Sequence, residues 1–148
     1  MIAAVGRPKD QALAAAIRDY ETRAARYWPI DVIEVKGERG DAVTVRAREG
    51  ERIRQRVGSP ATTVACDATG QRMSSERFAA WLQSERESAR EVAFMIGGAF
   101  GLDDGLRDSA QLRLSLAPWT LPHELARLVL AEQLYRAGTI VRGEPYHK

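Results

Sequence analysis

The stretch Val92-Ala-Phe-Met-Ile-Gly-Gly-Ala-Phe-Gly101 places three glycines directly after a short apolar run. A continuous apolar run of this length, bounded by glycine, is typical of a strand buried on both faces of a parallel sheet. Glycine at a strand end supplies a positive φ or lets the backbone approach another group closely. We therefore expect a buried strand over residues 91–96, followed by a turn that is either a ligand loop or only a tight corner.

The rest of the chain alternates strands with helices. Strands are predicted at residues 2–5, 30–35, 62–66, 91–96 and 111–116, and helices at residues 9–27, 41–57, from 74 or 75 onward, in a short turn from 103, and at 122–137. This alternation predicts one α/β domain over residues 1–148, with a mainly parallel sheet flanked by helices. Ligands of such sheets bind at the carboxyl ends of strands, so the loops after Cys66, Ile96 and Leu116 form the candidate site.

Composition narrows the class of protein. The chain has 148 residues, a net charge of +2 and 28% charged residues, which is ordinary for a globular protein. It has no apolar run near the roughly 20 residues that a membrane span needs, and no basic, apolar leader at its start. The single cysteine cannot form an internal disulfide or a cysteine-based metal cluster. We expect a cytoplasmic protein with no bound metal and no membrane association.

Arginines are concentrated within eleven residues, at positions 46, 48, 52, 54 and 56. They are interpreted first as a solvated helix face interleaved with Glu49 and Glu51. The alternative is a surface that contacts the phosphates of a nucleic acid. The modest net charge does not by itself indicate such a surface.

The glycine loop does not fit the known phosphate-binding patterns. The order Gly97-Gly98-Ala99-Phe100-Gly101 lacks the spacing of a dinucleotide fingerprint and follows the fourth strand instead of the first. A P-loop requires Lys and Ser or Thr after its last glycine, where this chain has Leu102 and Asp103. Two aspartates at the next helix start would repel phosphate, so an uncharged or cationic ligand fits better.

The predicted last helix is apolar on two sides. Leu125, Leu128 and Val129 form one stripe, and Leu130, Leu134 and Ala137 form another. A helix that is apolar on two sides is buried on two sides, and in a small domain we expect a partner subunit to be the second cover. His123 at the helix start is expected to be structural, and Glu132 with Arg136 to form an ion pair.

IGGAFGLDD and LSLAPWTLPHELARLVLAEQLYRAGTIVRGEPYHK resemble the ribosomal large-subunit methyltransferases that methylate N3 of a pseudouridine. These enzymes belong to the SPOUT class, which uses S-adenosylmethionine. The resemblance implies a C-terminal trefoil knot, with the knot and cofactor loops within about residues 60–148, and a homodimer. It also implies that the substrate is 23S rRNA in the large subunit of an assembled ribosome.

The resemblance also implies which residues form the site. Those that contact the cofactor, carried over by position, are Cys66, Gly97, Leu116, Ala117, Pro118, Trp119, Thr120 and Leu121. Two positions depart from the family pattern: Phe100 stands where relatives carry a polar or acidic residue, and Cys66 where leucine is common. Phe100 is expected to close the pocket differently at the amino acid end of the cofactor, whereas Cys66 should serve as a small buried hydrophobe.

The C-terminal tail provides the predicted catalytic groups. His147 is the hypothesis for the base that removes the N3 proton or for a group that orients the uracil edge. Arg142 and Lys148 would hold phosphate or an anionic base, and Tyr146 would stack or donate a hydrogen bond. The alternative is that the tail only closes the cofactor loops or the dimer. A second functional hypothesis is an RNA-binding assembly factor that has kept the fold and lost catalysis.

Overall fold

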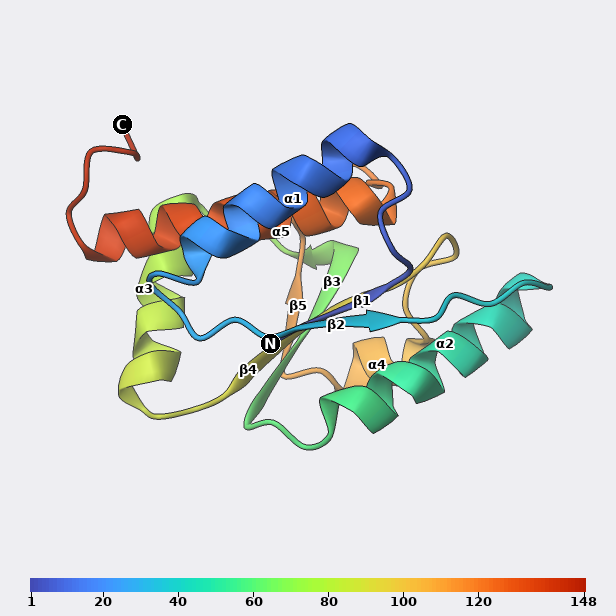
Figure 1. Ribbon diagram of the computed structural model, residues 1–148. Helices are drawn as coiled ribbons and strands as arrows, with labels where there is room; N and C mark the ends of the chain where they lie inside the picture. Colours follow the sequence, from blue (N-terminus) through green and yellow to red (C-terminus); the bar gives the residue numbers. More distant parts are fainter.

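The computed structural model describes all residues from 1 to 148. Five parallel strands form one sheet in the order β2-β1-β4-β3-β5, with helices on both faces (Figure 1). The α/β fold with a parallel sheet is therefore confirmed. The elements are β1 (Ile2–Val5), α1 (Gln11–Ala24), β2 (Val32–Val35), α2 (Ala42–Val57), β3 (Thr62–Gln71), α3 (Ser75–Glu87), β4 (Val92–Ile96), α4 (Asp104–Ser109), β5 (Leu112–Leu114) and α5 (His123–Val141).

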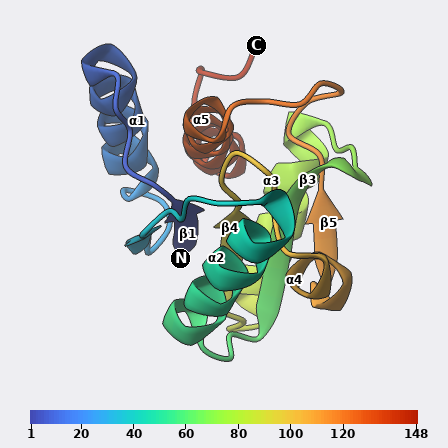
Figure 2. The same ribbon diagram turned by 90° about the vertical axis from the view of Figure 1, so that its right-hand side faces the viewer.

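Two hydrophobic clusters hold the layers together. Because successive strand residues point to opposite faces, Phe94 and Ile96 of β4 pack under α1, α3 and α5, whereas Ala93 and Met95 pack against α2 and α4. Figure 2 shows these layers, with α1 and α5 above the sheet and α2 and α4 below it. The apolar run that forms β4 is thus buried on both faces of the sheet, as predicted.

Side-chain caps fix the starts of four helices. Asp10, Asp41, Ser74 and Asp103 each accept a hydrogen bond from the backbone N–H three residues later. The helix starts predicted at Asp41, Ser74 and Asp103 are therefore confirmed.

Two elements are longer than predicted. β3 continues past Cys66 to Gln71, and its Gly70 packs directly against the backbone of Arg113 in β5, where a Cβ would lie 2.6 Å from the carbonyl carbon. α5 continues past Ala137 to Val141 because Gly138 leaves room for the ring of Tyr27. Both extensions depend on contacts between distant segments, which a local pattern does not reveal.

Two charged residues, Arg127 and Glu49, are buried. Arg127 of α5 is 6% exposed and pairs with Glu21 at 2.8 Å and Glu34 at 2.9 Å. Glu49 of α2 is 4% exposed, so the interpretation of residues 46–56 as a wholly solvated face is wrong at this position. The arginines of this helix behave as the first interpretation expects, since four of the five pair with acidic side chains: Arg46, Arg48, Arg52 and Arg54.

The two apolar stripes of α5 differ in how they are covered. Leu130, Leu134 and Ala137 are buried within the chain, where α5 packs between α1 and α3. The chain itself therefore covers this stripe, which leaves the other stripe for the expected second cover. The stripe of Leu125, Leu128 and Val129 remains only half-buried. No helix combines the length and apolarity required to cross a membrane.

Candidate functional site

A cleft of about 780 Å³ opens where β3, β4 and β5 end and α5 begins. It is the carboxyl edge of the sheet, where the sequence placed the site. Seven of the eight predicted cofactor-binding residues line the cleft, and Pro118 does not. The remaining lining residues are Asp67, Ala68, Thr69, Ile96, Gly98, Ala99, Phe100, Gly101, Leu102, Pro122, His123 and Ala126.

The glycines of the loop after β4 are required by the protein's own packing. A Cβ on Gly97 would lie 2.3 Å from the carbonyl carbon of Gly101, because the loop doubles back on itself. The N–H of Gly101 donates to the carbonyl of Gly98 at 3.0 Å, and Gly101 has a φ of 80°. A Cβ on Gly98 would lie 2.7 Å from the carboxyl group of Glu49. The loop is therefore a tight corner, and its outer side forms one wall of the cleft.

Large apolar side chains stand at the rim of the cleft. Trp119 is 76% exposed and Phe100 48%, and Leu116 and Leu121 lie further in. The Ser115 hydroxyl donates to the carbonyl of Ala117 at 2.7 Å and orders the loop that carries Trp119. Aromatic and aliphatic walls of this kind suit a flat heterocyclic ring.

No lysine or arginine lines the cleft. Asp67 is its only lining carboxylate, and it accepts hydrogen bonds from the N–H and hydroxyl of Thr69. Partial burial raises the pKa of Asp67, but these hydrogen bonds and the charges of Arg107 and Arg113 together hold the pKa below its ordinary value. The cleft therefore carries negative charge and suits a cation better than a phosphate.

Cys66 has no thiolate chemistry at neutral pH. Burial, together with the charge of Asp67, raises the pKa of its thiol to about 12. The thiol is therefore protonated, which agrees with the role expected of it as a small apolar group.

His123 lies in the cleft, which the sequence analysis did not anticipate. Its ring packs against Gly6 after β1, where a Cβ would lie 3.3 Å from Nε2, and Nε2 is 3.9 Å from Glu124. Phe100 and Asp67 were likewise absent from the predicted contact set, although both lie next to residues or turns that the sequence did point to. His123, Phe100 and Asp67 could have been included because each lies in or next to one of the three loops that the sequence analysis placed together.

The predicted catalytic residues do not line the cleft of their own chain. Tyr146 donates to Glu132 at 3.1 Å, lies 3.3 Å from the hydroxyl of Tyr20, and has a pKa raised by burial and these neighbours. Arg142 has its guanidinium 5.8 Å from the centre of the Tyr27 ring. These partners lie on α1, directly after α1 and midway along α5.

His147 is held between two charged side chains. Its Nε2 lies 2.7 Å from Glu76 of α3, and its Nδ1 lies 3.4 Å from Arg136 of α5. Arg136 is itself paired with Glu132 at 2.6 Å, which confirms the predicted ion pair. The tail is thus packed against α3 and α5 and does not extend away from the domain.

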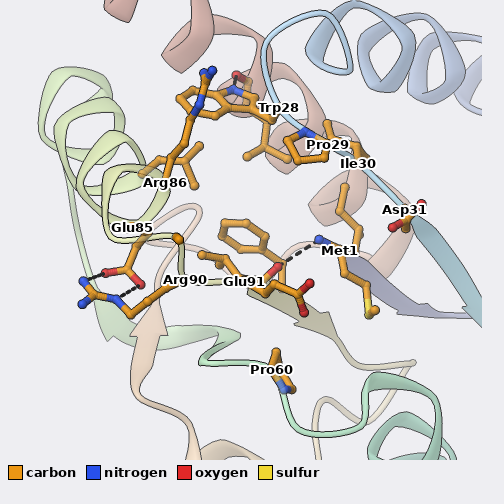
Figure 3. A pocket seen from close by; sticks show the side chains of 16 residues that line it. Met1, Trp28, Pro29, Ile30, Asp31, Pro60, Glu85, Arg86, Arg90 and Glu91 are labelled. Atoms are coloured by element: carbon orange, nitrogen blue, oxygen red, sulfur yellow. Dashed lines mark hydrogen bonds and ion pairs between the residues drawn. The ribbon is translucent and has the colours of Figure 1, made fainter.

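A second cavity of about 330 Å³ lies at the opposite, amino-terminal edge of the sheet (Figure 3). More than half of its lining residues are hydrophobic, and several of its polar groups are paired: the Met1 ammonium donates to the carbonyl of Val92 at 2.9 Å, and Arg90 pairs with Glu85 at 2.6 Å. None of the eleven predicted site residues lines it. The cleft at the carboxyl edge is therefore the candidate site.

Comparison with known proteins agrees with this placement. The family model described as "Predicted SPOUT methyltransferase" matches residues 1–147. The chain belongs to the SPOUT methyltransferase family. Its fold is also that of a solved structure described as a hypothetical protein, with a TM-score of 0.51 and 17% sequence identity over 95% of this chain and 80% of that one.

Two relatives of this SPOUT methyltransferase carry a more specific name. A protein of Gemmatimonas aurantiaca is 64% identical over 97% of this chain and 96% of its own length. A protein of Syntrophotalea carbinolica is 43% identical over 97% of this chain and 94% of its own length. Both are named ribosomal RNA large subunit methyltransferase H.

The cleft fits the methyl donor of SPOUT methyltransferases. S-adenosylmethionine carries a sulfonium cation and an adenine ring but no phosphate. The apolar, aromatic rim and the absence of basic lining residues match that chemistry. The protein is therefore an S-adenosylmethionine-dependent methyltransferase.

Proposed function

We propose that the protein methylates N3 of a pseudouridine in the 23S rRNA of an assembled ribosome in the cytoplasm. The observation that carries this proposal is the 64% identity, over nearly the full length of both chains, with a relative named for ribosomal RNA large-subunit methylation. The net charge of +2 also suits a substrate recognised by its shape, since an enzyme that binds free RNA electrostatically needs a larger basic surface.

We propose that the cofactor lies in the cleft against the seven lining residues of the predicted set. Leu116 and Leu121 would enclose the adenine, and Trp119 would cover it from the rim. Pro118, the eighth residue of the set, would act by fixing the loop between Ala117 and Trp119. When bound, S-adenosylmethionine supplies the activated methyl group, and the protein has to hold the acceptor nitrogen in line with it.

We propose that the active protein is a homodimer in which the tail of one protomer completes the cleft of the other. The tail follows the end of α5 and reaches back to Glu132, which lies roughly 14 Å of helix from the cleft residue His123. His147, Tyr146 and Arg142 do not line the cleft of their own chain. The half-buried stripe of α5 and exposed Trp119 offer apolar area for the second protomer.

The tail would then provide the acid–base and positioning groups. His147 would take the proton from N3 or orient the uracil edge, Arg142 would hold phosphate or a developing anion, and Tyr146 would stack on the base or donate a hydrogen bond. As part of the same proposal, the chain forms a C-terminal trefoil knot within about residues 60–148.

Mass spectrometry of large-subunit rRNA tests the proposed substrate. Cells that lack the protein should lose one methylated pseudouridine, and purified protein with S-adenosylmethionine should restore it on their ribosomes. An unchanged set of rRNA modifications in the deleted cells would contradict the proposed substrate. Restoration on free rRNA but not on ribosomes would contradict the assembled ribosome as the target.

A further inference from the structure

Glu49 is a buried carboxyl group with one oxygen that has no partner. The residue lies on α2 and is 4% exposed. Its Oε1 accepts a hydrogen bond from the backbone N–H of Glu38 at 2.9 Å. Its Oε2 is inaccessible to solvent and makes no hydrogen bond. An unpaired buried carboxyl oxygen costs free energy, so its retention calls for a reason.

The unpaired oxygen points at the glycine loop of the cleft. The position that a Cβ of Gly98 would occupy lies 2.7 Å from Oε2, so this oxygen stands against the backbone of a residue that lines the cleft. Glu49 therefore stands directly behind the wall of the site.

The helix that carries Glu49 is fixed firmly against this loop. Gly50 lets α2 approach so closely that a Cβ there would lie 2.6 Å from the Cβ of Asp103. Arg54, one turn further on, pairs with the same aspartate at 2.8 Å. These contacts hold Glu49 in place, and the side chain cannot turn to solvent without separating α2 from the loop.

The charge of Glu49 has no counterpart among the residues of the cleft. Asp67, the lining carboxylate, is already hydrogen-bonded to Thr69, and no lysine or arginine lines the site. Charges separated by several ångströms through protein interact far more strongly than they do in water. A carboxylate behind Gly98 would therefore act on any cation bound in front of it.

We infer that Glu49 is a specificity-determining residue that makes the cleft prefer the cationic methyl donor over its neutral product. This inference rests on the proposed cofactor site. During transfer the sulfur–methyl bond breaks, its electron pair stays on the sulfur, and the methyl group bonds to the acceptor nitrogen, whose proton passes to a base. The sulfur thereby changes from a cation to a neutral thioether. Glu49 attracts the ligand before the transfer and not after it, which favours exchange of the product for a fresh methyl donor.

Titration calorimetry with S-adenosylmethionine and S-adenosylhomocysteine tests this inference. Both ligands carry the same amino acid end, so they differ in charge only at the sulfur. Glu49→Gln keeps the shape of the side chain, and we expect it to raise the Kd of S-adenosylmethionine about tenfold while that of S-adenosylhomocysteine changes less than about twofold. Glu51→Gln, on the exposed face of the same helix, should change neither Kd.

A kinetic readout separates this role from mere support of the loop. An attraction to the sulfonium stabilises the bound ground state, so its loss should raise the KM for the cofactor without lowering kcat. A parallel rise of both Kd values would overturn the inference, because it would assign Glu49 to loop support. Unchanged Kd values would also overturn it, because Oε2 would then simply pair with a buried water molecule.

A second measurement needs no variant and stays decisive if Glu49→Gln fails to fold. The wild-type protein should bind S-adenosylmethionine and sinefungin, which carries an ammonium group near the position of the sulfonium, about tenfold more tightly than S-adenosylhomocysteine. Equal or tighter binding of the neutral product would contradict the inference. Failure of the wild-type protein to bind any of the three would instead contradict the proposed cofactor site.

Discussion

At the scale of single residues, Gly97 shows most directly why the chain keeps glycine after its central strand. A Cβ at this position would overlap the backbone of Gly101, and backbone cannot move aside as a flexible side chain can. The corner that carries the cleft wall therefore depends on this residue for its shape.

We expect Gly97→Ala to lower the free energy of unfolding by at least about 3 kcal/mol, the upper part of the range for overpacked cores. Gly58→Ala is a suitable comparison, because Gly58 has a φ of 68° and no atom near its missing Cβ. That variant bears only backbone strain, which costs on the order of 1–3 kcal/mol in a sparsely populated region of this kind. Urea unfolding of both variants tests the expectation, and equal losses would show that the loop yields to the added methyl group.

Much of the site could be predicted residue by residue, and the exceptions have physical reasons. The three loops could be located because strand ends in a parallel sheet share one edge, and seven of the eight carried-over residues line the cleft there. The burial of Glu49 and Arg127 could not be predicted, because the partners that enclose them come from distant segments. The pattern of charges along a helix does not identify such partners.

At the scale of elements, the tail is bound to α3 through Glu76 and His147. A hydrogen bond from Ser74, together with the backbone N–H of Glu76 and the ring of His147, lowers the pKa of Glu76 from 4.5 to about 2. Since the folded pKa lies below the unfolded value, the stability that this carboxylate contributes is fully present above about pH 4.5. It is lost as the pH falls toward 2.

Thermal unfolding between pH 6 and pH 2.5 tests this contribution. We expect Tm to fall more steeply below pH 4.5 in the wild-type protein than in Glu76→Gln, whose amide does not titrate. Glu87→Gln, at the far end of the same helix, should keep the wild-type slope. Identical slopes in all three proteins would show that Glu76 does not stabilise the folded state through its charge.

Helix starts were more predictable than element ends. Capping by Asp41, Ser74 and Asp103 is a local interaction over three residues, so the sequence alone reveals it. The extension of β3 to Gln71 and of α5 to Val141 depends on Gly70 and Gly138 meeting other segments. Tertiary contacts of this kind override local propensity.

At the scale of the whole molecule, the tail is held against α3 and α5 and does not line the cleft of its own chain. The sequence indicated both the cleft and the tail but not how they lie relative to each other, because that depends on the path of the chain in space. A homodimer reconciles the two, because each cleft would then receive the tail of the other protomer.

Mixed dimers test whether each site is shared between protomers. We expect His147→Ala and the cleft-filling variant Ala117→Trp to be inactive as homodimers. Unfolded and refolded together, they should regain about a quarter of wild-type methylation, because half of the dimers would be mixed and each would hold one intact site. No recovery, in mixtures shown to contain mixed dimers by mass spectrometry, would mean that cleft and tail of one chain act together.

The most direct test of the account is calorimetric titration of S-adenosylmethionine into the wild-type protein and two cavity-filling variants. Ala117→Trp fills the cleft at the carboxyl edge, and Ile30→Trp fills the cavity at the opposite edge. The account predicts that the wild-type protein and Ile30→Trp bind the cofactor with equal affinity, whereas Ala117→Trp keeps its Tm and does not bind. Undiminished binding by Ala117→Trp, or its loss in a folded Ile30→Trp, would contradict the placement of the methyl donor in the cleft.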